Sequence, residues 1–229
     1  MAEHEQLLRT TSLHDRRARL ARAHLYLVTE ASTPIAVLRA ALDGGADILQ
    51  LRDPSLSDAE LLEAAEPFRT LCDEHDALFF VNDRPDLALA ARADGVHVGQ
   101  TDASVAAARE QTGGGMLVGL STHSPEQLRA GVGSGADQLS VGPVWETPTK
   151  PGRPAAGLEY VRHAAAQELA VPWFAIGGID EANAAEVVEA GAERVVVVRA
   201  IRDAEDPSSA AARLRATFAP SEVLRGAAQ

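Results

Sequence analysis

The chain has 229 residues, of which 46% are hydrophobic and 24% are charged, and its formal net charge is −12. This length suits one barrel-sized domain, and the composition is ordinary for a globular protein whose core folds without disulfides or metals. An acidic chain without a basic stripe argues against a nucleic-acid binder, and no apolar run reaches the roughly 20 residues that span a bilayer. The single cysteine, Cys72, excludes an internal disulfide and is expected to be an inert buried thiol. Because the N-terminus lacks a secretory signal, we expect a cytoplasmic protein.

Along the chain, one polar segment precedes a regular alternation of strands and helices. Residues 1–22 are predicted to form an arginine-rich helix outside this pattern, with residues 15–20 as a solvated face. The strand-like runs fall near 24–29, 47–52, 78–83, 95–99, 116–121, 138–144, 171–177 and 194–199. The helix-like segments fall near 34–43, 57–75, 85–92, 103–111, 124–134, 157–169, 181–190 and 208–218.

The strands are continuous apolar runs, such as the four valines at 195–198, which is typical of strands covered on both faces. Eight strands, each followed by a helix, predict an α/β fold of the (β/α)8 TIM-barrel type with an extra N-terminal helix. The expected domains are a helical extension at 1–22, one catalytic barrel at 23–220 and a tail at 221–229. An open doubly wound sheet is the alternative, but the first strand-to-helix turn lacks its glycine-rich fingerprint.

Three turns between a helix and the next strand share a pattern of small residues followed by an acidic one. They lie at 44–47, 133–137 and 190–193. Glycine suits the left-handed end of the helix, and alanine allows close packing. We interpret the acidic residues as structural groups at the amino-terminal end of the barrel.

Two aspartates follow adjacent predicted strands, Asp83 after the third and Asp102 after the fourth. Neighbouring strand ends bring such carboxylates close together, and oxygen ligands without histidine or cysteine suit Mg²⁺. Each aspartate could instead be the N-cap of the following helix. Their occurrence as a pair favours the metal site.

A second strand carries polar residues at its end. Gln50 and Arg52 alternate with leucines, so both point to the same face. An arginine that faces a barrel interior requires an anion or a carboxylate partner. The alternative to anion binding is a structural ion pair with Asp53 or Asp47.

Two loops are predicted to hold phosphate. The loop at 142–152 is long, stiffened by prolines, and carries two threonines and a lysine. Gly177 and Gly178 follow the seventh strand and precede a helix near Glu181, an arrangement that suits a phosphate cradle. The histidines show neither zinc-ligand spacing nor a hydrolytic triad, so each is interpreted as structural.

Several motifs occur together and in order on successive strands. They are Gln-Leu-Arg-Asp at 50–53, Asn-Asp-Arg at 82–84, Gly-Val-His-Val-Gly-Gln-Thr-Asp at 95–102, Ser-Thr-His-Ser at 121–124, Gly-Pro and Thr-Pro-Thr-Lys within 142–150, and Ala-Ile-Gly-Gly-Ile at 175–179. Over residues 24–215 the chain resembles the thiamine phosphate synthase family. The resemblance implies a transferase that joins hydroxymethylpyrimidine diphosphate to a thiazole phosphate and releases pyrophosphate.

The resemblance also implies a role for each matching residue. Gln50 binds the pyrimidine, and Asp83 and Asp102 hold Mg²⁺. The diphosphate is held by Arg52, Asn82, Ser121 and Lys150, of which Arg52, Ser121 and Lys150 are the expected catalytic residues. The thiazole phosphate is held by Thr147, Pro148, Thr149, Gly177, Gly178, Val198 and Arg199.

The chain departs from the family pattern at two positions. Pro54 stands where the family usually has lysine, and Arg199 stands where serine often occurs. The loss of lysine leans toward the related thiazole tautomerase, but that enzyme's pattern has histidine at the position of Pro143 and gives the aspartate pair no purpose. A non-catalytic sensor of phosphate ligands is a further alternative. The expected partners are small-molecule substrates, with no nucleic acid and no membrane, and a homo-oligomer is left open.

Overall fold

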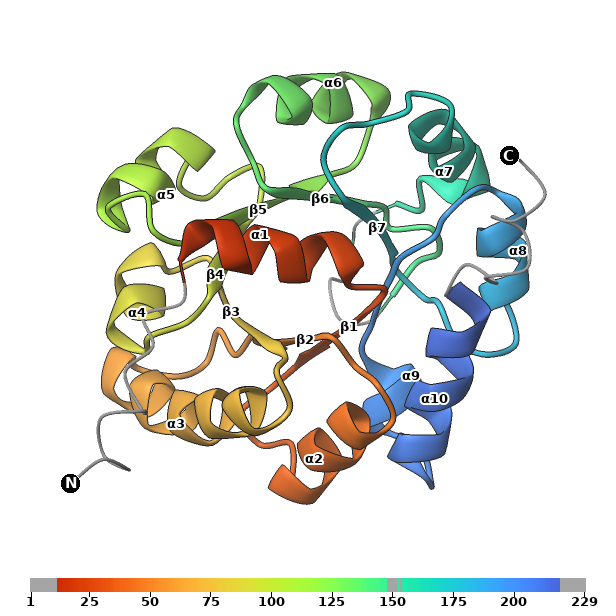
Figure 1. Cartoon of the computed structure of the whole chain (residues 1–229). Helices are drawn as coiled ribbons and strands as arrows, with labels where there is room; N and C mark the ends of the chain where they lie inside the picture. The colour runs from red at the N-terminus through yellow and green to blue at the C-terminus, as the bar shows by residue number, and fades with distance from the viewer. Residues whose placement is uncertain (1–11, 148–151, 153, 219–229) are drawn as a thin grey trace.

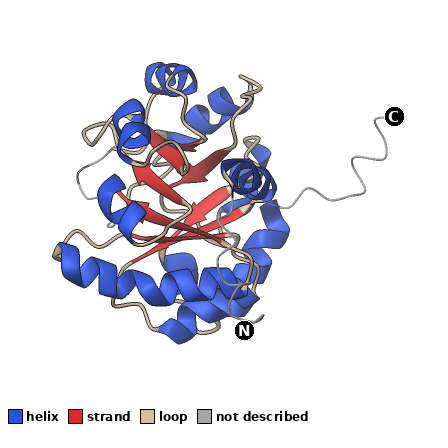
Figure 2. Ribbon diagram, turned by 60° about the vertical axis from the view of Figure 1, so that its left-hand side comes forward, coloured by secondary structure: helices blue, strands red, loops and turns tan. Residues whose placement is uncertain are grey.

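The computed structural model describes residues 12–147, 152 and 154–218. Among them, eight parallel strands close a barrel in sequential order from β1 to β8, and helices surround it (Figures 1 and 2). The strands are β1 (Leu25–Thr29), β2 (Ile48–Leu51), β3 (Leu78–Asn82), β4 (Gly95–Val98), β5 (Leu117–Thr122), β6 (Gln138–Val141), β7 (Trp173–Ile176) and β8 (Val195–Val197). The predicted TIM-barrel fold is confirmed, and the open sheet is excluded.

The helices follow the predicted alternation, with two corrections at the end of the chain. They are α1 (Leu13–Arg22), α2 (Ile35–Asp43), α3 (Asp58–Glu74), α4 (Pro85–Ala90), α5 (Val105–Gln111), α6 (Pro125–Gly133), α7 (Gly157–Ala165), α8 (Ala184–Glu189), α9 (Arg199–Arg202) and α10 (Pro207–Phe218). The helix expected near Glu181 begins at Ala184, because a turn intervenes after the glycine pair. The eighth strand ends at Val197, and Arg199 begins the short helix α9 instead of closing the strand.

Apolar side chains fill the barrel in two layers. One buried cluster joins the outer faces of the strands to the helices, and a second lies inside the barrel. In the inner cluster, the ring of Tyr26 lies 5.7 Å from those of Phe80 and Phe174. Leu20 of α1 and the following Ala23 belong to the same cluster, so α1 closes the amino-terminal end of the barrel (Figure 1). The open end is therefore the carboxyl end of the strands.

The solvated face that the sequence suggested for residues 15–20 is only partly present: Arg17 is exposed, but three arginines of α1 also bond to the barrel. Arg16 donates to Asp94 at 3.1 Å, Arg17 donates to Asp137 at 2.8 Å, and Arg19 donates to the Ala77 carbonyl at 2.7 Å. Two of these arginines are only 16% exposed. The sequence did not predict these bonds, because the partners of Arg16 and Arg17 are aspartates that precede distant strands. Local composition does not reveal such partners.

Asp47, Asp94 and Asp137, each of which directly precedes a strand, are structural residues. This role was predicted for Asp47 and Asp137. Asp47 accepts the backbone N–H of Leu25 at 3.0 Å, and Asp137 accepts that of Val118 at 2.8 Å. Asp94 accepts the N–H of Phe79 at 2.9 Å and a bond from Arg69 at 2.8 Å. Burial alone would raise the pKa of Asp94, but the Arg69 charge and these hydrogen bonds outweigh it and lower the pKa. The amino-terminal end of the barrel is thus a stability layer.

Two further expectations concern the rest of the chain. Cys72 is fully buried, and burial raises the pKa of its thiol to about 12, so an inert thiol is confirmed. No helix among the described residues is long and apolar enough to cross a membrane.

Candidate active site

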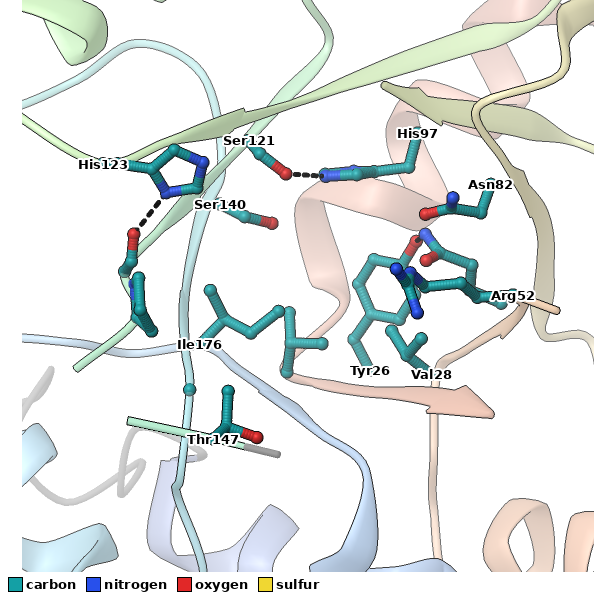
Figure 3. A pocket seen from close by; sticks show the side chains of 15 residues that line it. Tyr26, Val28, Arg52, Asn82, His97, Ser121, His123, Ser140, Thr147 and Ile176 are labelled. Carbon is teal, nitrogen blue, oxygen red and sulfur yellow. Dashed lines mark hydrogen bonds between the residues drawn. The ribbon is translucent and has the colours of Figure 1, made fainter. Parts of the chain in front are cut away.

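A pocket opens at the carboxyl end of the barrel, and every strand contributes to it (Figure 3). Because the strands are parallel, the residues that end them converge on this mouth. It is lined by Tyr26, Val28, Gln50, Arg52, Asn82, His97, Ser121, His123, Ser140, Gly142, Pro143, Thr147, Ile176, Gly177 and Val196. Four residues expected to hold the pyrimidine diphosphate are therefore together: Gln50, Arg52, Asn82 and Ser121. Lys150 lies outside the described residues.

Arg52 brings a positive charge to this pocket, and the described part of the chain gives it no ion pair. Its Nε is buried and has no hydrogen-bond partner among the described residues. The alternative of an ion pair with Asp53 or Asp47 is wrong. Asp53 accepts from Ser55 at 2.6 Å, and Asp47 pairs with Arg215. An orphaned, buried guanidinium N–H suits an anionic ligand.

Gln50 is buried and is oriented by a tyrosine. Its Nε2 donates to the Tyr26 hydroxyl at 2.6 Å, and Tyr26 is buried on β1. Burial raises the pKa of Tyr26 well above its ordinary value, so the phenol stays protonated. Gln50 Nε2 is therefore already used in a hydrogen bond within the protein.

The two aspartates lie after adjacent strands, and neither of them is a helix cap. The N-cap of α4 is Arg84, and the N-cap of α5 is Ser104, whose side chain accepts from Ala107 N. Asp83 adopts a left-handed backbone with φ of 60°, and its carboxylate accepts from the Asn82 amide. The capping alternative is therefore wrong for both.

The donor set at these aspartates is sparse. Asp102 is exposed, and its Oδ2 accepts the Gly99 N–H at 2.9 Å. Among the described residues, no group of three or more histidine, cysteine or acidic side chains is placed to hold a metal ion. Two carboxylates alone suit Mg²⁺, which keeps several waters and takes other oxygens from a phosphorylated substrate.

A second pocket adjoins the first and contains the predicted thiazole-phosphate residues that the structure describes. It is lined by Thr147, Gly177, Gly178, Ile179, Asp180, Val196, Val197, Val198, Arg199, Ala200 and Asp203. The two pockets share Thr147, Gly177 and Val196. Pro148 and Thr149 lie outside the described residues.

The glycine pair is required by geometry. Gly177 and Gly178 have φ of 107° and 67°, a region that favours glycine. A side chain at Gly178 would also lie 2.9 Å from the Cβ of Trp145. The backbone amides can thus approach a ligand closely, and α9 begins beside them at Arg199.

Several lining residues were not predicted as site residues. Tyr26 and Ser140 were not singled out, and His97 and His123 were interpreted only as structural. His123 donates from Nδ1 to the Gly142 carbonyl at 2.6 Å, and His97 Nε2 lies 2.9 Å from Ser121 Oγ. Alternation along β4 could have identified His97, because its neighbours Val96 and Val98 pack in the outer cluster.

Fold and pockets together define a class: a (β/α)8 barrel whose carboxyl-end mouth carries two adjoining pockets. Comparison with known proteins gives the family. The model described as thiamine monophosphate synthase matches residues 25–201. A thiamine-phosphate synthase of Acidothermus cellulolyticus is 51% identical over 209 residues, covering 89% of this chain and 98% of that protein. The chain belongs to the thiamine monophosphate synthase family, whose named members are enzymes.

Two further likenesses support this placement. A thiamine-phosphate synthase of a Nostoc species is 50% identical over 85% of this chain, and the chain spans just over half (56%) of that relative's length. The solved structure of thiamine phosphate pyrophosphorylase from Pyrococcus furiosus superposes with a TM-score of 0.78 at 35% identity, covering 88% of this chain and 96% of that one.

Proposed function

We propose that this protein is a thiamine-phosphate synthase that condenses 4-amino-2-methyl-5-(diphosphooxymethyl)pyrimidine with a thiazole phosphate. The observation that carries the proposal is the pair of adjoining pockets that share Thr147 and Gly177. Two phosphorylated substrates bound there would lie side by side at one mouth. Such positioning suits a bimolecular condensation, because it converts the reaction into one between neighbours.

The first pocket would take the pyrimidine diphosphate. Gln50 would hydrogen-bond the pyrimidine, held in its orientation by Tyr26. Arg52, Asn82, Ser121 and Lys150 would hold the diphosphate, and Arg52 Nε provides a donor that no described residue uses. Donors fixed in advance at the leaving group stabilise the charge that develops on it as the C–O bond breaks.

Asp83 and Asp102 would hold Mg²⁺ through carboxylate oxygens. Bound Mg²⁺ would shield the negative charge of the departing pyrophosphate. The two aspartates follow neighbouring strands, β3 and β4, which pair from Phe80 to Asn82. Neither aspartate caps a helix, which supports the metal role.

The second pocket would take the thiazole phosphate on Thr147, Pro148, Thr149, Gly177, Gly178, Val198 and Arg199. The thiazole nitrogen supplies the electron pair for the new C–N bond and carries no proton. No general base is needed for that step, so positioning suffices. This accounts for a pocket in which His97 and His123 are committed to hydrogen bonds with protein groups.

A turnover assay with both substrates tests the proposal. The purified protein is expected to release pyrophosphate and form thiamine monophosphate only when Mg²⁺ and both substrates are present. Substitution Asp102→Ala is expected to abolish this activity while leaving the thermal midpoint within a few degrees, because Asp102 is exposed. Unchanged turnover in Asp102→Ala refutes the metal assignment.

Other products would favour the alternatives. Isomerisation of the thiazole precursor without Mg²⁺ or pyrophosphate release indicates a tautomerase, and binding without turnover indicates a sensor. Cytoplasmic location is part of the proposal, and fractionation of cells tests it. Oligomeric state is measured by light scattering.

A further inference from the structure

Three buried polar side chains on neighbouring strands form a chain of hydrogen bonds that leads into the first pocket. Gln138 of β6 lies with Nε2 2.8 Å from His97 Nδ1, and His97 of β4 lies with Nε2 2.9 Å from Ser121 Oγ on β5. Figure 3 shows the second of these contacts at the edge of the pocket. Gln138 is 0% exposed, and the other two are 7% exposed. Gln138 itself does not line the pocket.

A glycine makes the contact between Gln138 and His97 possible. In the strand register, Gly119 of β5 pairs with His97 on one side and with Gln138 on the other. A Cβ at this position would lie 2.5 Å from His97 Nδ1 and closer still to Gln138 Nε2. The amide and the imidazole thus meet in the space that any side chain at 119 would fill.

The direction of each bond follows from the chemistry of the donors. An amide nitrogen only donates, so His97 Nδ1 must accept. The imidazole proton then lies on Nε2, which donates to Ser121 Oγ. The Ser121 hydroxyl proton must point elsewhere, and no acceptor for it lies among the described residues. Because Ser121 lines the pocket, this proton is available to a ligand there.

The orientation of Gln138 is costly to the fold. Its Oε1 is buried and has no hydrogen-bond partner among the described residues. An orphaned buried carbonyl destabilises a protein, and an apolar side chain of the same size would fill this space without that penalty. The presence of an amide side chain at position 138 is therefore better explained by its hydrogen bond to His97 than by packing.

We propose that Gln138 is a positioning residue that acts through His97 to fix the Ser121 hydroxyl as a donor to an anionic phosphate oxygen in the pocket. The proposal rests on the proposed function only for the identity of the ligand. It assigns a site role to a residue outside the pocket, and it makes a testable statement about the imidazole tautomer.

The first test measures the tautomer directly by ¹⁵N NMR of the imidazole in the whole, unliganded protein. In the wild type we expect His97 with Nε2 protonated and Nδ1 unprotonated. In Gln138→Glu, a carboxylate of the same shape accepts from Nδ1, and the tautomer is expected to reverse. A wild-type spectrum with the proton on Nδ1 overturns the proposal, as does a Gln138→Glu spectrum identical to that of the wild type.

The second test is a double-mutant cycle on the dissociation constant of inorganic pyrophosphate, measured by calorimetry with Mg²⁺. Gln138→Met keeps the volume but removes the donor, and Ser121→Ala removes the hydroxyl. Each single variant is expected to weaken binding roughly 10- to 100-fold, the effect of a hydrogen bond to a charged group. The double variant is expected to be no weaker than Ser121→Ala, because Gln138 acts only through that hydroxyl. Additive effects overturn the proposal.

Thr122→Val is the matched control for stability. Thr122 is buried beside Ser121 but bonds outward, to the Tyr160 hydroxyl at 2.7 Å and the Ser140 carbonyl at 2.9 Å. It is expected to lower the thermal midpoint without changing pyrophosphate affinity or the tautomer. Equal loss of affinity in this control would show that Gln138 acts through stability alone. Neither binding nor NMR needs turnover, so an inactive wild type refutes the proposed function and leaves this test intact.

Discussion

Arg52 offers the sharpest test of how the pocket is built, because its two expected effects have opposite signs. Substitution Arg52→Met removes the guanidinium but keeps most of the side-chain stem. The Arg52 Nε is buried without a partner among the described residues, so the fold bears an unsatisfied donor. We expect the variant to be more stable than the wild type and to bind pyrophosphate more weakly.

Both magnitudes follow from the unsatisfied donor. An orphaned buried donor destabilises a protein by about 1–3 kcal/mol, so the free energy of unfolding should rise by a similar amount. A hydrogen bond to a charged group contributes about 1.5–3 kcal/mol, which corresponds to a loss of affinity of roughly 10- to 150-fold. Urea denaturation measures the first quantity, and calorimetry with pyrophosphate and Mg²⁺ measures the second.

Arg84→Met is the matched control, since Arg84 also follows a strand end but is satisfied. It pairs with Asp58 at 2.8 Å and Asp86 at 3.0 Å on the surface. Its loss should lower stability by at most about 1 kcal/mol and leave pyrophosphate affinity unchanged. If Arg52→Met is less stable than the wild type and binds pyrophosphate equally well, the view of Arg52 as an anion-binding residue is refuted.

Two further predictions concern opposite ends of the barrel. At the amino-terminal end, Asp94→Asn should lower the free energy of unfolding by about 3 kcal/mol at pH 7, because it removes the buried charge that pairs with Arg69 and leaves only the exposed Asp73. The folded-state pKa of Asp94 is lowered, so its stabilisation is present above about pH 4 and lost as the pH falls. Urea denaturation at a series of pH values measures the free energy of unfolding of both proteins. The difference between wild type and variant should become smaller in acid, and a difference that does not change with pH contradicts the ion-pair account. At the carboxyl end, Gly178→Ala should lower stability by about 1 kcal/mol because of its φ of 67° and should raise the KM for the thiazole phosphate more than that for the pyrimidine diphosphate. Equal changes in both KM values would place Gly178 outside the thiazole site.

Much of the fold could be predicted because its signals are local. Continuous apolar runs such as 195–198 marked strands covered on both faces, and their regular alternation with helices identified the barrel. The parallel direction of the strands then required Gln50, Arg52, Asn82 and Ser121 to meet at one end, as the pocket confirms. The roles of these residues in substrate binding remain predictions.

The errors in the prediction occurred where distant residues determine the outcome. The arginines of α1 resembled a solvated surface until Asp94 and Asp137 were found beneath them. The helix cap that was the alternative for Asp102 is excluded, because the helix begins at Val105 with Ser104 as its cap. In both cases a short segment of sequence allows two environments, and only the structure selects one.

By itself, the sequence determined the strand order, the end of the barrel at which the site lies and several of the residues that ring it, because strand period and direction are properties of the chain. Only the tertiary structure decided which polar groups are paired. It left Arg52 Nε without a partner in the described part of the chain, joined Gln50 to Tyr26, and linked Gln138 to His97 over Gly119. Hydrogen bonds depend on separations of a few tenths of an ångström between side chains, and those separations are set only when the strands close into a barrel.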